Sequence, residues 1–266
     1  MTQVSDVGAI DKTRQLGTAT LRREDERLLT GGGQFLDDLP FDDFYEAAIL
    51  RSSYAHARIR SIDTAAAKKL RGVIAVFTAR ELGPILKDLP PKVVHPKLNY
   101  QIRLPIVKEY ARYIGEPIAV VVAENRYIAE DALELIEVDY EPFDSVGSTS
   151  DALKPNAPLV HVGSDSNVAV HIVQQAGDPE AALRVAPHVL GETFQVTRGG
   201  GHSIEGRAVA ARFDATTRQL IVWDNTQAPH YVRQMLANIY EVSEDEIRLI
   251  APADIGGGFG PKAQFY

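Results

Sequence analysis

Residues 118–143 carry the clearest folding signal in the sequence. An apolar, largely β-branched run over residues 118–123 predicts a buried strand. Four apolar side chains then fall on one face of a helix predicted over residues 126–136, and residues 137–143 are extended again. A strand–helix–strand unit of this kind indicates a mixed α and β architecture.

Shorter elements flank this unit, and together they predict an α+β protein of two domains. Strands are predicted over residues 44–51, 57–62, 73–78, 168–174, 188–197, 208–213, 220–224 and 248–251, and helices over residues 65–70, 79–82, 180–185 and 229–240. A Gly-Ser-Thr-Ser stretch at residues 147–150 is typical of an interdomain linker. We therefore expect a polar lead over residues 1–20, a first domain over 21–146, a linker over 147–165 and a second domain over 166–266.

The composition excludes several classes of function. A net charge of -8 opposes a phosphate backbone or an anionic membrane as the main partner, so we expect no nucleic acid. The absence of cysteine excludes disulfides and thiolate-bound iron–sulfur clusters in this chain. No apolar run reaches the roughly 18 residues of a membrane span, and the polar start is not a secretory signal. We expect a cytoplasmic protein with a small-molecule substrate and no membrane span.

The glycine-rich segment Gly256-Gly257-Gly258-Phe259-Gly260 follows directly after a predicted strand. Glycines let a backbone approach a ligand closely and point its N–H groups into a concavity. The alternative is a purely structural bend. The segment is not a nucleotide P-loop, because Pro261-Lys262-Ala263 lacks the Gly-Lys-Ser/Thr ending. It also does not match the Gly-x-Gly-x-x-Gly fingerprint of dinucleotide-binding proteins.

A second candidate segment lies between a predicted strand and a predicted helix, at Asn225-Thr226-Gln227. Gln227 is the candidate ligand-binding residue, because its amide can donate to an oxo group or accept from bound water. Capping of the helix by Asn225 or Thr226 is the structural alternative. The glycine-rich surroundings of His202 and Glu205 argue against a zinc-binding helix, and no serine hydrolase motif occurs.

Four separated motifs, in order, resemble the large subunits of molybdenum hydroxylases, the xanthine dehydrogenase, aldehyde oxidase and carbon monoxide dehydrogenase family. They are Arg23-Glu24-Asp25 with Arg27-Leu28-Leu29-Thr30-Gly31, then Arg51-Ser52 with Tyr54-Ala55-His56-Ala57, then Tyr113-Ile114-Gly115-Glu116-Pro117, and finally Thr226-Gln227 with Gly256 to Lys262. The resemblance begins near Leu16. It implies an α+β fold in which a hammerhead-type α/β domain precedes the first part of a molybdopterin-binding domain.

The resemblance also implies roles for these residues. Gln227 would hydrogen-bond the apical oxo ligand of molybdenum, while Gly257, Gly258, Phe259 and Gly260 would line a molybdenum–molybdopterin cofactor, which we expect in its cytosine dinucleotide form. No residue of this chain is expected to ligate the metal directly. By the same resemblance, 2Fe-2S clusters and FAD lie on an iron–sulfur subunit and an FAD subunit. The family hydroxylates a carbon centre of an aldehyde or an N-heterocycle with water-derived oxygen.

Three departures from the family pattern limit these expectations. The catalytic glutamate belongs to a second cofactor-binding half, so we expect no catalytic residue here and no turnover without a complementary C-terminal molybdopterin-binding subunit. Gly206 stands between Glu205 and Arg207, where many relatives carry proline. Ala263 follows the motif lysine, where purine-oxidising members carry glutamate, and this argues against a purine substrate.

Two alternatives remain open from the sequence. The chain could be a non-catalytic binding or scaffolding module that retains the fold. It could also be an α/β enzyme of another family, in which the glycine-rich bend binds an ordinary phosphate. The substrate and the electron acceptor are not determined by these residues.

Overall fold

A computed structural model describes Gly17, Ala19 and residues 21–91, 94–99, 101, 103–196 and 199–264. Most of the expected lead over residues 1–20 and the end of the strand predicted at Thr197 therefore lie outside the described residues. The described strands form three sheets of three strands each. No helix in the described part of the chain is long and apolar enough to cross a bilayer.

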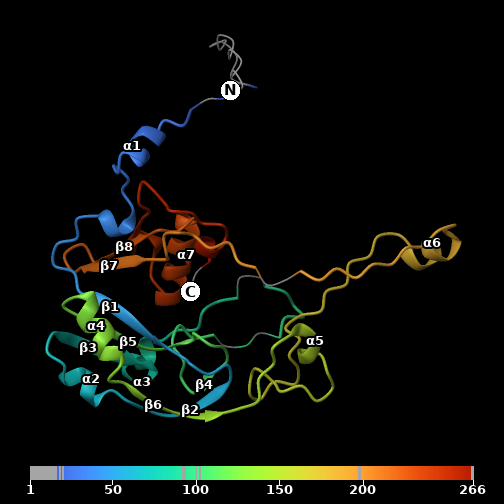
Figure 1. Cartoon of the computed structure of the whole chain (residues 1–266), viewed down its shortest axis with the longest axis horizontal. Helices are drawn as coiled ribbons and strands as arrows, with labels where there is room; N and C mark the ends of the chain where they lie inside the picture. Colours follow the sequence, from blue (N-terminus) through green and yellow to red (C-terminus); the bar gives the residue numbers. More distant parts are fainter. Residues whose placement is uncertain are drawn as a thin grey trace, which may run out of the picture.

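Two of these sheets form the first domain (Figure 1). Their strand orders are β1-β5-β3 and β4-β2-β6, and all pairings are antiparallel. The strands are β1 (Glu46–Arg51), β2 (Ala57–Asp63), β3 (Val73–Thr78), β4 (Tyr110–Ala111), β5 (Pro117–Ala123) and β6 (Glu137–Pro142). The helices are α2 (Ala65–Lys69), α3 (Ala79–Leu82), α4 (Arg126–Leu133) and the short 3-10 turn η2 (Gly83–Ile85).

The core of this domain lies between the central strand β5 and the helices α2 and α4. Alternate residues of β5, including Val121 and Ala123, are fully buried against Ala67, Ala129 and Ala132 of the helices. These small helical side chains let the helices pack closely on the sheet, and the side chain of Asn125 caps α4 by accepting from Ile128 N. The strand–helix–strand prediction is thus confirmed, although α4 ends three residues before the predicted end at Ile136.

The third sheet, β7-β8-β9, belongs to the second domain. Its strands are β7 (Val209–Asp214), β8 (Gln219–Asp224) and β9 (Ile247–Ile250), and α7 (Pro229–Tyr240) connects β8 to β9 ahead of η3 (Glu244–Glu246). β7 pairs antiparallel with β8, whereas β8 and β9 are parallel. The predicted capping box is present, with Ser243 and Glu246 closing the turn before β9. After β9, the short η4 (Pro261–Ala263) follows the glycine-rich segment.

Residues before β1 contact the second domain. They include α1 (Asp25–Leu29) and η1 (Leu36–Asp38). The rings of Phe41 and Phe44 pack edge-on against Trp223 of β8, with ring centroids 5.4 and 5.9 Å away. Arg27 of α1 forms an ion pair with Asp254, in the segment that follows β9.

The linker contains α5 (Thr149–Ala152), and the second domain begins with a long projecting arm, which we define as residues 168–196. The arm carries α6 (Pro179–Val185) at its tip, far from both domains (Figure 1). The helix begins as predicted, with Asp178 accepting from Ala181 N and Pro179 at the first turn. The strands predicted over residues 168–174 and 188–197 are absent from the described residues, because no neighbouring strand pairs with either segment.

Candidate functional site

The two candidate segments leave the same edge of the third sheet. Gln227 follows β8, and the glycine-rich segment follows β9, its parallel neighbour in the register Trp223↔Ile250. The carboxyl ends of adjacent parallel strands lie side by side, and ligands of open α/β sheets bind outside such ends. Segments about 30 residues apart in sequence therefore meet at one place.

Gln227 is held in place by the segment that follows the glycines. Its backbone N–H donates to the carbonyl oxygen of Lys262 at 3.0 Å, and its Oε1 accepts from Gly260 N at 2.9 Å. The carbonyl oxygen of Lys262 also accepts from the Thr226 hydroxyl at 2.8 Å. Since Oε1 is engaged, the exposed amide group presents Nε2, which can only donate.

Asn225 and Thr226 do not cap α7, contrary to the structural alternative. Asn225 is buried and bonds the chain before β7, donating to Gly206 O at 2.8 Å and accepting from Ala208 N at 3.1 Å. The α7 N-cap position is Ala228, which has no side-chain cap. Thr226 accepts from Ala228 N at 3.1 Å and so shapes the turn that presents Gln227.

The glycines of the second segment are required by close packing. A Cβ on Gly258 would lie 2.2 Å from Cδ of Gln227, and a Cβ on Gly256 would lie 2.5 Å from Cβ of Glu205. Gly257 and Gly260 have φ of 94° and 95°, which side chains rarely adopt. Phe259 also has a positive φ, 50°, and its ring is 70% exposed. A large exposed aromatic ring on a strained residue is a feature of binding sites more than of cores.

A buried ion pair lies beneath this turn, and its pairing was not predicted from the sequence. The Lys262 side chain is only 1% exposed, and its Nζ lies 2.6 Å from Oε2 of Glu205, which also accepts from Gly256 N at 2.8 Å. Burial acts to raise the pKa of Glu205, but the hydrogen bonds from Lys262, Asn225 and Gly256 outweigh it and lower that pKa. The Glu205 carboxylate is thus held ionised and engaged, which does not suit a general base.

Two polar atoms next to the turn have no partner among the described residues. They are Oε1 of Glu205 and Oγ of Ser203, both buried. Oγ of Ser203 would lie 3.3 Å from a Cβ placed on Gly257. Buried polar atoms without partners are uncommon, and they leave hydrogen-bonding capacity for a bound group or water beside the glycines.

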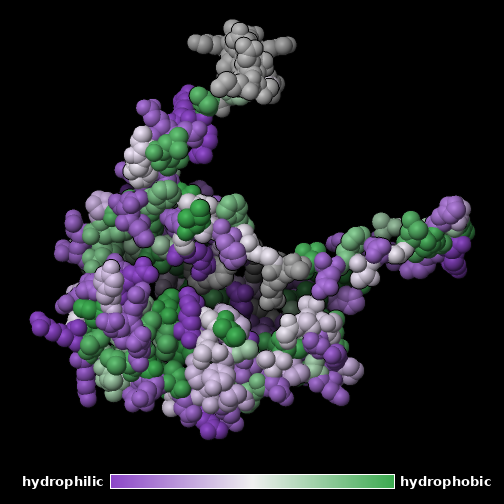
Figure 2. Space-filling model, viewed as in Figure 1, coloured by the Kyte–Doolittle hydropathy of each residue, from purple (hydrophilic) through white to green (hydrophobic). Residues whose placement is uncertain are grey.

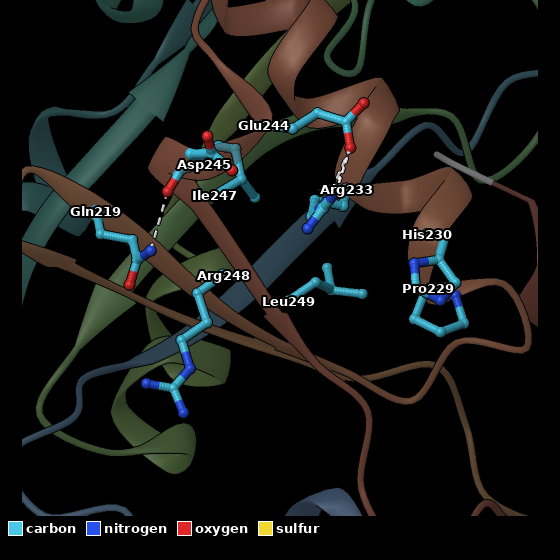
Figure 3. Close-up of a pocket in the computed structure, with 9 residues that line it drawn as sticks. All are labelled: Gln219, Pro229, His230, Arg233, Glu244, Asp245, Ile247, Arg248 and Leu249. Atoms are coloured by element: carbon cyan, nitrogen blue, oxygen red, sulfur yellow. Dashed lines mark hydrogen bonds and ion pairs between the residues drawn. The ribbon is translucent and has the colours of Figure 1, made fainter.

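A separate hollow of roughly 260 Å³ lies beside α7 (Figure 3). It is lined by residues of α7, η3 and β9, where Arg233 pairs with Glu244 at 2.5 Å and Gln219 donates to the carbonyl oxygen of Asp245 at 3.0 Å. None of the five expected site residues lines it. The described residues contain no cluster of three or more His, Cys, Asp or Glu side chains that could hold a metal ion.

Comparison with known proteins decides between the alternative families. Residues 30–144 match the aldehyde oxidase and xanthine dehydrogenase a/b hammerhead domain, and residues 160–266 match the molybdopterin cofactor-binding domain. The chain belongs to the molybdenum hydroxylase family. A phosphate-binding enzyme of another family is therefore ruled out, and the predicted α+β fold, a hammerhead domain followed by a molybdopterin-binding domain, is confirmed.

Relatives of this molybdenum hydroxylase chain differ in what they oxidise. The chain is 35% identical to the carbon monoxide dehydrogenase large chain of Afipia carboxidovorans, over 96% of its own length and 32% of the relative. It is 32% identical to the nicotine 6-hydroxylase large subunit of Paenarthrobacter nicotinovorans, over 94% and 30%. The structure of quinoline 2-oxidoreductase from Pseudomonas putida 86 superposes with a TM-score of 0.87 at 35% identity, covering 94% of this chain and 32% of that one. The chain thus spans about a third of the length of these relatives.

Proposed function

We propose that this chain supplies the amino-terminal half of a molybdopterin site in a multisubunit molybdenum hydroxylase. Its first domain, residues 21–146, would position the second domain, residues 166–266, through the linker at 147–165. Activity would require a complementary C-terminal molybdopterin-binding segment, an iron–sulfur subunit with 2Fe-2S clusters and an FAD subunit. We place the assembly in the cytoplasm.

The observation that carries this proposal is the contact between Gln227 and the glycine-rich turn. Gly260 N holds Oε1 of Gln227, so the free Nε2 donates outward beside the turn. The fit of a cofactor to these residues is supported by the exposed ring of Phe259 and by the buried unpartnered atoms of Ser203 and Glu205.

In this proposal each residue of the chain binds or orients. The molybdenum–molybdopterin group, which we propose in its cytosine dinucleotide form, supplies two-electron oxidation of a substrate carbon with oxygen from water. Nε2 of Gln227 donates a hydrogen bond to an acceptor atom of that group, Gly257 and Gly258 allow its close approach, and the ring of Phe259 excludes water at its side. No residue of the chain is assigned as the proton acceptor.

The proposed substrate is an aldehyde or an N-heterocycle. Nicotine and quinoline, named in two of the relatives, are N-heterocycles, which supports this class. Ala263, in place of a glutamate after Lys262, supports a non-purine substrate. Carbon monoxide, the substrate named for another relative, is the competing choice, and turnover assays with all three substrate classes discriminate between them.

The test is affinity purification of the tagged chain from its native cells, with metal analysis and mass spectrometry of co-purifying proteins. We expect about one molybdenum per complex and iron from the partner clusters. In the same complex, Gln227→Ala should retain the molybdenum and lower turnover. A metal-free chain without molybdopterin-binding partners would contradict the proposal and favour a non-catalytic scaffold.

A further inference from the structure

The projecting arm exposes apolar side chains in a pattern typical of paired strands. On its outgoing leg, Val168, Val170 and Ile172 alternate with other residues, and on its returning leg, residues 188–196, Phe194 and Val196 do so. Residues with this alternation ordinarily form strands with one buried face. In this chain, Leu190 is 98% exposed, Phe194 85% and Val196 91%. Figure 2 shows apolar patches along the arm.

The backbone of the returning leg makes no hydrogen bonds to other described residues, and its side chains are not buried. Every residue from 187 to 196 is exposed, and no hydrogen bond joins residues 188–196 to any other described residue. On the outgoing leg, one backbone bond anchors the base of the arm, from Asn99 N to Ala169 O at 2.7 Å. The arm therefore offers both unpaired backbone groups and unburied side chains, which are the two requirements for adding a strand to a neighbouring sheet.

The third sheet also exposes apolar side chains, on its edge strand. Strand β7 is the edge strand of the β7-β8-β9 sheet, and its side chains Val209 and Phe213 are 66% and 62% exposed. The arm and β7 both lie within the 160–266 segment that matches the molybdopterin cofactor-binding domain. An open edge strand and an unpaired arm in one domain indicate that the sheet is incomplete within these 266 residues.

We propose that the returning leg, residues 188–196, pairs as a strand with a complementary molybdopterin-binding segment outside these 266 residues. The inference rests on the proposed function, and it names the contact through which the second half of the site is recruited. This occupant is favoured because the chain spans only about a third of its relatives, 32% and 30% of the first two, and because the arm belongs to the domain that holds Gln227.

Site-specific photo-cross-linking in native cells identifies the occupant directly. A benzophenone amino acid at Phe194 should cross-link to a molybdopterin-binding segment, identified by mass spectrometry of the linked peptide. The matched control is the same probe at Tyr127 of α4, which is 79% exposed on the first domain and should give no such product. Cross-links from position 194 only to a second copy, only to an iron–sulfur or FAD subunit, or to nothing would overturn the proposal.

Proline substitution tests whether backbone pairing is the mode of contact. Thr193→Pro removes an N–H from the leg, where it has no partner among the described residues, so the isolated chain should fold unchanged. In the complex, association should weaken roughly tenfold or more. Gly147→Pro, at an exposed linker position, is the control and should associate normally. Equal association of both variants would overturn strand pairing.

Hydrogen exchange separates this inference from the proposed function. Amides of residues 188–196 should exchange at unprotected rates in the isolated chain and become protected in the complex. Protection in a complex without molybdenum would retain the docking inference and contradict the cofactor assignment. Molybdenum in a complex with an unprotected leg would contradict the docking inference alone.

Discussion

Arg27 and Asp254, 227 positions apart in the sequence, form a two-pronged ion pair that joins the first helix to the segment leading into the glycine-rich turn. Nη2 of Arg27 lies 2.7 Å from Oδ1 of Asp254, and Nη1 contacts Oδ2. Asp254 also exchanges two hydrogen bonds with the backbone of Gln34, accepting at 2.7 Å and donating through its own N–H at 3.3 Å. The amino-terminal segment thus fixes the base of the candidate site.

This ion pair predicts a specific acid dependence of stability. The hydrogen bond from Arg27, with that from Gln34 N, lowers the pKa of Asp254 from 3.8 to about 2. A carboxyl whose pKa is lower in the folded state stabilises it above pH 3.8, and this contribution is lost as the pH falls towards 2. Asp254→Asn should therefore lower the urea midpoint at pH 6, and the difference from the original chain should shrink between pH 4 and pH 2.

The single tryptophan provides the measurement. Trp223 packs against Phe41 and Phe44, so its fluorescence reports separation of the amino-terminal segment from the second domain. Asp139→Asn, at an exposed position of β6, is the matched charge control and should leave the midpoint unchanged. A constant difference for Asp254→Asn across the whole pH range would contradict the assignment.

The buried pair of Lys262 and Glu205 predicts an asymmetry between its two partners. Glu205→Gln leaves an ammonium group buried without its carboxylate, and should cost on the order of 3 kcal/mol of the free energy of unfolding. Lys262→Met removes the buried charge, while Glu205 remains 17% exposed and keeps the bond from Gly256, so its cost should be smaller. The double variant should be more stable than Glu205→Gln alone.

Urea titrations of the three variants form a double-mutant cycle that checks this asymmetry. Additive losses, or a double variant less stable than Glu205→Gln, would show that the two groups act independently. The fluorescence of Trp223 again reports unfolding, and far-UV circular dichroism confirms that each variant is folded before the titration.

Two glycines of the same turn should respond differently to alanine. A Cβ on Gly256 meets Cβ of Glu205, which the ion pair holds in place, so Gly256→Ala should destabilise the chain by about 1–3 kcal/mol. A Cβ on Gly258 meets the end of the exposed Gln227 side chain, which can move away, so Gly258→Ala should change stability by less than about 1 kcal/mol. Because it displaces Gln227, it should instead lower the turnover of the purified complex while molybdenum is retained.

Gly147→Ala is the control for both glycine variants, because a Cβ there meets nothing within 4 Å. Stability is measured by urea titration, and turnover is measured in complexes of known molybdenum content. If Gly256→Ala and Gly258→Ala behaved alike in both measurements, the contacts with Glu205 and Gln227 would not explain why glycine occupies these positions.

The sequence predicted elements whose partners lie nearby and missed contacts whose partners lie far away. The strand–helix–strand unit of residues 118–143 was predictable because buried side chains follow the periods of its strands and helix. Residues 188–197 also carry a strand pattern, yet the described ones pair with no other strand. A strand pattern shows that a segment is suited to pairing in a sheet, but it does not show that a partner strand is present.

Local patterns also limited prediction of the site. Gln227 and the glycines were predicted as site residues because amides and glycine runs have recognisable chemistry, and that assignment stays a prediction. Glu205 and Lys262 were matched to the family, but their pairing crosses 57 positions and leaves no periodic trace. Lys262 itself offered a clue to this pairing. It is a charged residue beside a glycine run, and a buried charged residue requires a partner of opposite charge.

The proposed role of Gln227 predicts a pH-dependent rescue. Gln227→Glu keeps an oxygen that can accept from Gly260 N, but it replaces the free donor Nε2 with a second carboxylate oxygen. Near pH 7 the variant complex should therefore lose turnover by roughly 100-fold, as expected for removal of a preorganised donor. As the pH falls below about 5, protonation of the new carboxyl restores an O–H donor. The turnover of the variant relative to the original complex should then rise, with molybdenum content constant throughout.

Gln219→Glu, in the hollow beside α7, carries the same charge change away from the turn and should show no such rescue. A Gln227→Glu complex whose relative turnover stays flat with pH would mean that Gln227 supports the turn through Gly260 alone and donates no hydrogen bond to the cofactor.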